Sequence, residues 1–73
     1  MKLSKELNFE DLKPYGFKKE GMFWTYYWGE QGRPSIGELI VDPDREVSIC
    51  TWSAGVTEIP AVLIGLIKDE VFV

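Results

Sequence analysis

Histidine is absent from the 73-residue sequence, and cysteine occurs once, at Cys50. Without histidine, the chain lacks the commonest protein ligand for zinc and the usual general base near neutral pH. A single cysteine cannot form an intramolecular disulfide, which excludes a disulfide-stapled scaffold. With no histidine to activate its thiol, Cys50 is expected to be a buried or half-buried structural residue rather than a nucleophile. We therefore predict that the chain is not an enzyme and that it uses no cofactor and no metal.

A basic surface and a long apolar run are also missing. The formal net charge is −4; residues 1–35 hold six Lys and Arg against five acids, and residues 36–73 hold two against seven. Nucleic-acid binding needs basic side chains that displace counterions, so a nucleic-acid partner is not expected. The longest apolar run, residues 59–67, is far shorter than the roughly 20 residues that span a bilayer. No secretory signal pattern is visible at residues 1–5, so we expect a cytoplasmic protein that does not contact a membrane.

Aromatic residues, by contrast, are concentrated in one stretch. Residues 22–28 read Met-Phe-Trp-Thr-Tyr-Tyr-Trp between Gly21 and Gly29. Aromatic and β-branched residues favour strands, and flanking glycines mark strand ends. Because side chains alternate along a strand, Met22 shares one face with three aromatic residues, and the opposite face carries the rest. The first set is Trp24, Tyr26 and Trp28; the second is Phe23, Thr25 and Tyr27.

The second half of the chain predicts a hairpin followed by a helix. Residues 36–41 and 47–52 are expected to be strands joined by Asp-Pro-Asp-Arg-Glu, whose first two residues suit a type I turn. The apolar pattern favours a register in which Val41 faces Val47 and Leu39 faces Ile49. From Thr57, a predicted cap, apolar residues recur with helical spacing. They are Ile59, Val62, Leu63, Leu66 and Ile67.

The predicted fold class is α+β, in a single small domain that covers residues 1–73. We expect a short N-terminal helix at about residues 9–13, a three-stranded antiparallel β-meander, and a C-terminal amphipathic helix packed on one sheet face. Asn8 can cap the first helix, and Pro14 is expected to end it at Lys13.

Two loops could in principle hold a site. Asp42, Asp44 and Glu46 gather carboxylates at the hairpin turn, but the glycine-containing calcium loop is absent, and the turn explains Asp42. Residues 29–35 contain two glycines and a proline, without the Gly-Lys-Ser/Thr ending of a phosphate loop. Neither loop therefore predicts a ligand.

One helix can cover only one face of the sheet, so the aromatic strand leaves an apolar face that needs a partner. We therefore predict a non-catalytic protein-interaction module that forms a homodimer, or binds another protein, through an aromatic sheet face. The outer face of the C-terminal helix also carries an apolar residue. The candidate contact residues are Phe23, Trp24, Tyr26, Tyr27, Trp28 and Ile64.

Two alternatives remain open at this point. A nucleic-acid-associated accessory protein would need a basic patch built from Lys13, Lys18, Lys19 and Arg33. An acidic polyanion mimic, of a prophage type, would need a carboxylate cluster built from Glu38, Asp42, Asp44, Glu46 and Glu58. Small-ligand binding by the aromatic face is also open.

Overall fold

The computed structural model describes residues 1–29, 37–51 and 60–73 of the chain. Within these ranges the fold is α+β: a four-stranded antiparallel sheet carries a 3₁₀-helix and a C-terminal α-helix on one face. The elements, in chain order, are η1 (Phe9–Tyr15), β1 (Lys18–Glu20), β2 (Phe23–Trp28), β3 (Gly37–Val41), β4 (Val47–Thr51) and α1 (Ala61–Lys68).

The sheet has one strand more than the sequence predicted. β1 pairs with β2 through Lys19↔Trp24 and its neighbours, and the strand order is β1-β2-β3-β4. Gly21 makes this hairpin possible, because its φ of 62° suits the first central position of a tight type II′ turn. β1 is short, charged and exposed, so it lacks the apolar alternation that reveals a strand in a sequence.

The register predicted for the second hairpin is confirmed. Val41 pairs with Val47, and Leu39 pairs with Ile49. The turn follows from Asp42, whose carboxylate accepts the amide hydrogens of Asp44 and Glu46 at 2.9 and 3.0 Å. Arg45 closes the turn in the left-handed region, with φ 70°. This is the three-residue hairpin loop in which a type I turn precedes one left-handed residue.

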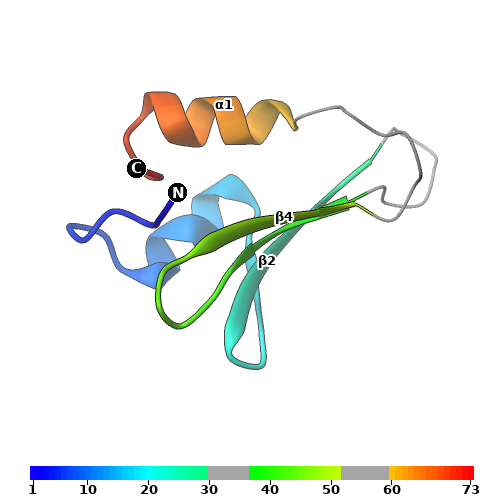
Figure 1. Ribbon diagram of the computed structural model, residues 1–73, viewed down its shortest axis with the longest axis horizontal. Helices are drawn as coiled ribbons and strands as arrows, with labels where there is room; N and C mark the ends of the chain where they lie inside the picture. The colour runs from blue at the N-terminus through cyan, green and yellow to red at the C-terminus, as the bar shows by residue number, and fades with distance from the viewer. Residues whose placement is uncertain (30–36, 52–59) are drawn as a thin grey trace.

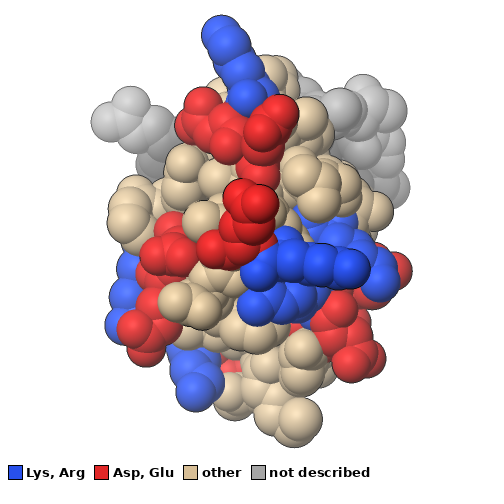
Figure 2. Space-filling view, turned by 90° about the vertical axis from the view of Figure 1, so that its left-hand side faces the viewer, with Lys and Arg blue, Asp and Glu red and all other residues tan. Residues whose placement is uncertain are grey.

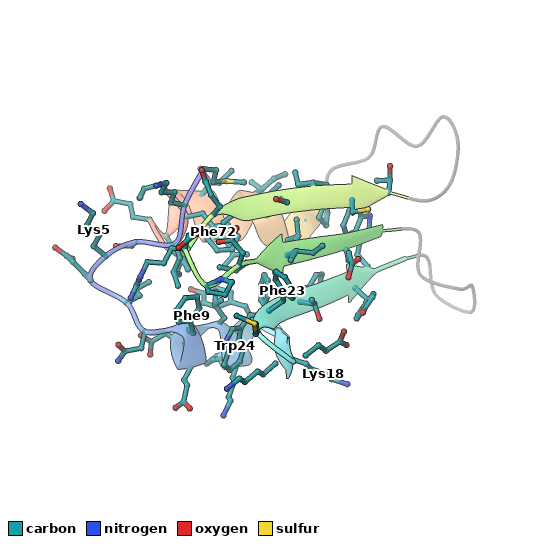
Figure 3. The ribbon with its side chains drawn as sticks, turned by 60° about the horizontal axis from the view of Figure 1, so that its bottom comes forward. Lys5, Phe9, Lys18, Phe23, Trp24 and Phe72 are labelled. Atoms are coloured by element: carbon teal, nitrogen blue, oxygen red, sulfur yellow. The ribbon has the colours of Figure 1, made fainter. Side chains whose placement is uncertain are left out.

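Both helical elements cover the same face of the sheet. Figure 1 shows α1 above the sheet, and Figure 3 shows α1 behind β3 and β4 with η1 toward β1 and β2. The core between the layers is almost wholly apolar, and each fully buried large side chain in it contributes about 1.5–3 kcal/mol. Its buried residues are Leu3, Leu12, Phe17, Trp24, Trp28, Leu39, Val41, Leu63, Leu66, Val71 and Phe72.

The N-terminal helix differs from the prediction in type and length. It is a 3₁₀-helix that continues through Pro14 to Tyr15, instead of ending at Lys13. In an α-helix the Pro14 ring would clash with the Glu10 carbonyl group, which helps to explain the tighter winding. At its start, the Asn8 backbone N–H donates to the Asp11 carboxylate at 2.8 Å.

Helix α1 is shorter than predicted. Pro60 holds the position before its first residue, Ala61, whereas the sequence placed the cap at Thr57, a residue outside those described. Its end is a Schellman motif, in which the Val71 amide donates to the Leu66 carbonyl and the Glu70 amide to the Ile67 carbonyl. Val71 and Leu66 are both buried in the core, as this motif favours.

The Schellman motif gives a stability prediction. Glu70 adopts φ 59°, a left-handed conformation that costs a residue with a Cβ about 1–2 kcal/mol. Glu70→Gly is therefore expected to raise the free energy of unfolding in urea by about 0.5–1 kcal/mol. Lys68→Gly, two residues earlier and within α1, is the control and should lower the free energy of unfolding by about 1 kcal/mol. Equal effects at the two positions would contradict the conformational explanation.

The two ends of the chain lie side by side at one end of the sheet (Figure 1). Lys2 and Val73 exchange two backbone hydrogen bonds of 2.7 Å, and the Leu3 amide donates to the Arg45 carbonyl at 2.8 Å. The Val47 amide donates to the Met1 carbonyl at 3.0 Å. The first residues therefore join the C-terminal segment to the start of β4.

Candidate functional site

The face of the sheet opposite α1 and η1 is the candidate site, and we call it the open face. Cross-strand partners share a face, so the strand register defines the members of the open face. They are Lys18, Glu20, Phe23, Thr25, Tyr27, Glu38, Ile40, Ser48 and Cys50. Figure 3 views the molecule from this side, with α1 behind the sheet.

The structure separates the six residues that the sequence selected. Phe23 and Tyr27 both lie on the open face and are 46% and 44% exposed. Trp24 and Trp28 are buried on the opposite face. They belong to the core and are not available to a partner.

Tyr26 and Ile64 also lie away from the open face. Tyr26 is partly buried on the core side, where its ring centroid is 5.5 Å from that of Phe17. Ile64 is 61% exposed on α1. Of the candidates, the structure therefore brings together only Phe23 and Tyr27.

The position of Tyr27 is fixed by Glu20. The Tyr27 hydroxyl donates to Glu20 Oε2 at 2.8 Å. Because Glu20 pairs with Phe23, the Tyr27 side chain runs back along β2 past Thr25 to reach it. Thr25 is only 5% exposed, and its hydroxyl has no hydrogen bond of ordinary geometry to any described residue. The hydrogen bond to Glu20 thus holds the Tyr27 ring in one orientation, near the buried Thr25 hydroxyl.

The same contact changes the acidity of Tyr27. Its pKa is raised above the usual 10.0, first by the hydrogen bond to Glu20, then by desolvation and by the negative charges of Glu20 and Glu38; the Thr25 hydroxyl acts weakly in the opposite sense. A raised pKa means that the folded state prefers the neutral phenol. The contribution of Tyr27 to the free energy of unfolding is therefore fully present below pH 10. It is lost as the pH rises through the pKa that Tyr27 has in the folded state.

Glu20→Gln tests this coupling. The variant should bring the Tyr27 pKa back toward 10, because the acceptor loses its charge and the largest cause of the shift is weakened. The measurement is an ultraviolet titration of the phenolate, with Tyr27→Phe used to assign the signal. Tyr15, whose pKa is raised by desolvation and by Asp69, should not respond to Glu20→Gln. An unchanged Tyr27 titration would contradict the contact.

Side chains on the open face border a shallow hollow of about 270 Å³. Two aromatic rings and two carboxylates face this volume, and it therefore combines apolar walls with negative charge. The residues that line it are Glu20, Phe23, Thr25, Tyr27, Glu38 and Ile40. The sequence missed Glu20 and Glu38 as site residues, because only the strand register places them beside Phe23 and Tyr27.

A second hollow, of about 330 Å³, lies at the end of the first hairpin. It is lined by Phe9, Lys19, Gly21, Met22, Trp24 and Pro43. Figure 3 shows Phe9 and Trp24 near one another at this end of the sheet. Lys13 Nζ lies 5.8 Å from the Trp24 ring centroid, within the range of a cation–π contact.

The basic patch considered from the sequence is divided. Lys13 and Lys19 lie near Trp24, whereas Lys18 lies on the open face. Arg33 lies outside the described residues. Figure 2 shows acidic and basic side chains mixed over the end of the molecule that it views.

The acidic residues do not gather on one surface either. Asp42, Asp44 and Glu46 belong to the second turn, but Glu38 lies four residues from Asp42 along β3, about 13 Å away. Glu58 is outside the described residues. Among residues 1–29, 37–51 and 60–73, no group of three potential metal ligands occurs.

Cys50 corrects one expectation. The sequence predicted a buried or half-buried thiol, but Cys50 is exposed. It lies on β4, one of the two outermost strands of the sheet, and on the open face.

Comparisons with protein-family models, curated proteins and solved structures found no match to this chain. Within the described part of the chain, no helix has the length and apolar character needed to cross a membrane.

Proposed function

We propose that this chain is a non-catalytic protein-interaction module whose contact surface is the open face. One observation carries the proposal: Phe23 and Tyr27 are both exposed on the sheet face that α1 and η1 leave uncovered, and both line one hollow there. Tyrosine is enriched at the energetic centres of protein interfaces because it combines a large apolar area with a polar group. Here its hydroxyl is already fixed by Glu20, which reduces the entropy that binding would cost.

The chemistry of the hollow favours a cationic side chain in an apolar setting. Glu20 and Glu38 supply negative charge, and Phe23 and Tyr27 supply aromatic faces. An arginine or lysine could then make a cation–π contact and an ion pair together. The net charge of −4 would also attract a basic partner at long range. We propose that the partner presents an arginine between apolar residues.

The dimensions of the open face suit a short peptide segment of a partner better than the broad surface of a folded domain. Four strands spaced about 4.8 Å apart and up to six residues long give an area of about 14 by 20 Å. Stable interfaces bury about 800 Å² on each partner. Self-association through this face, which the sequence predicted, is therefore expected to be weak and remains a prediction.

The test is equilibrium binding of a fluorescent peptide with one arginine between two leucines. The matched peptide replaces arginine with citrulline, which keeps the shape and removes the charge. We expect the arginine peptide to bind at least about tenfold more tightly, which corresponds to about 1.4 kcal/mol.

Variants locate the binding. Phe23→Ala and Glu38→Gln should each weaken binding of the arginine peptide, whereas Met22→Ala, at a 72% exposed position in the first turn, should leave it unchanged. Equal binding of the two peptides, or no effect of Phe23→Ala, would overturn the proposal.

A further inference from the structure

The two edges of the sheet have opposite characters. β1 is three residues long and reads Lys-Lys-Glu, the short charged form that prevents edge pairing. β4 has five residues, Val-Ser-Ile-Cys-Thr, with no charge, and four of the five are exposed. An uncharged, β-prone outer strand is open to pairing with another strand.

The backbone groups that β4 directs outward follow from the hydrogen-bond pattern. The Asp42 amide donates across the hairpin to the Glu46 carbonyl, so residue 46 faces β3. Successive residues alternate in direction, so Val47, Ile49 and Thr51 direct their N–H and C=O groups away from β3. The Val47 N–H already donates a hydrogen bond to the Met1 carbonyl at 3.0 Å. Among the described residues, the outward groups of Ile49 and Thr51 have no backbone partner outside the sheet.

An apolar strip accompanies this edge on the α1 side. Ile49 faces that side and is 48% exposed. At the C-cap of α1, Asp69 lies toward η1, because its carboxylate is 3.4 Å from the Tyr15 hydroxyl. Ile67 lies about 200° around the helix from Asp69 at 100° per residue, and so points toward the β4 edge. Ile67 is 51% exposed, and Ile64 beside it is 61% exposed.

We propose that a second copy of this chain pairs with the β4 edge, with the two-fold axis at Cys50. Each Ile49 then exchanges two hydrogen bonds with Thr51 of the other copy, which gives four bonds in all. The two Cys50 residues become a non-hydrogen-bonded pair with Cα atoms about 4.5 Å apart. A two-fold axis at Ile49 would instead place Thr51 where Met1 already pairs with Val47.

A second copy fits this edge because the edge is self-complementary. Its outward donors and acceptors match their own two-fold image, and β4 brings no like charges together. The isoleucine strips of both copies meet on one side. On the other, the two open faces join into an eight-stranded surface. The inference concerns β4 and holds whether or not the open face binds a partner.

The first test measures mass by light scattering under reducing conditions. The wild type should move from 8.4 kDa toward 16.8 kDa, twice that value, as its concentration rises. Ile49→Lys and Thr51→Lys place a charge on the edge and should each weaken association by at least about tenfold. Met22→Lys adds the same charge at an exposed turn and should not. Phe23→Ala, which tests the open face, should also leave the dimer intact.

The second test fixes the register through Cys50, the only cysteine. Copper phenanthroline in air removes two electrons and two protons from a pair of thiols to form a disulfide. The wild type should cross-link at least about tenfold faster than Cys50→Ser/Ser48→Cys, in which the thiols lie well beyond disulfide reach.

A monomer at all concentrations, or a dimer unaffected by Ile49→Lys and Thr51→Lys, would overturn the inference. Equal cross-linking rates for the wild type and for Cys50→Ser/Ser48→Cys would overturn the proposed pairing register, with its two-fold axis at Cys50.

Discussion

Replacing Gly37 with alanine is expected to lower the free energy of unfolding by about 3 kcal/mol. A Cβ at this position would lie 2.5 Å from Cζ2 and Cη2 of Trp28 and 2.8 Å from the backbone carbonyl oxygen of Cys50. Trp28 pairs with Gly37 across the sheet and lies over it. Neither the buried indole nor the backbone of β4 can move away cheaply, so the sheet itself must distort. Urea unfolding followed by far-ultraviolet circular dichroism measures the loss.

Gly65→Ala is the matched control. Gly65 lies within α1, where an added Cβ meets nothing within 4 Å, so alanine should stabilise the protein by about 0.5–1 kcal/mol. Adding Trp28→Leu to Gly37→Ala should cost less than the sum of the two single changes, because the smaller side chain removes the clash. Strict additivity would show that Trp28 is not the residue that requires glycine.

Removal of the Arg45 side chain is expected to cost about 2–3 kcal/mol. Its Nη1 donates to the carbonyl oxygens of Ser4 and Leu7, each at 2.7 Å. Its guanidinium carbon lies 5.2 Å from the ring centroid of Phe9. One side chain therefore holds the N-terminal segment against the second hairpin. Loss of these charge-assisted bonds leaves two carbonyl groups without their partner, and the cost should appear in urea unfolding.

Comparison of Arg45→Gly with Arg45→Ala separates side chain from backbone. Both delete the guanidinium, but only alanine keeps the penalty of the left-handed φ of 70°. Arg45→Ala should therefore be less stable than Arg45→Gly by about 1 kcal/mol. Arg45→Lys keeps the charge but loses the forked geometry, and should fall between the wild type and Arg45→Ala. A wild-type stability for Arg45→Ala would rule out the tethering role.

Much of the sheet could be predicted because apolar side chains mark it directly. The aromatic run at residues 22–28 is β2 apart from its first residue, and the pairing of Leu39 with Ile49 followed from pattern alone. The sequence also required that one face of β2 remain uncovered by α1. It did not identify that face, since both carry aromatic side chains. Packing against Leu12, Leu63 and Leu66 selects the tryptophan face for the core.

The remaining features depend on tertiary contacts that leave little local signal. β1 is charged and exposed, and it is held by pairing with β2. Its sequence therefore lacks the apolar alternation from which a strand is predicted. Cys50 is exposed because it lies on the open face of an outermost strand, whereas the prediction of a buried thiol rested on a strand position alone. Glu20 reaches Tyr27 only through the β1–β2 register. The carboxylates of the site were missed for that reason.

The most direct test is an NMR titration of isotopically labelled protein with the arginine peptide, read at the side chains of β2. We predict that the resonances of Phe23 and Tyr27, with those of Glu20 and Glu38, shift in a saturable way. The indole signals of Trp24 and Trp28 should remain nearly unchanged, because both rings are buried on the opposite face. Saturable shifts confined to the indoles or to α1, or no shifts with the arginine peptide, would contradict the assignment of the open face as the contact surface.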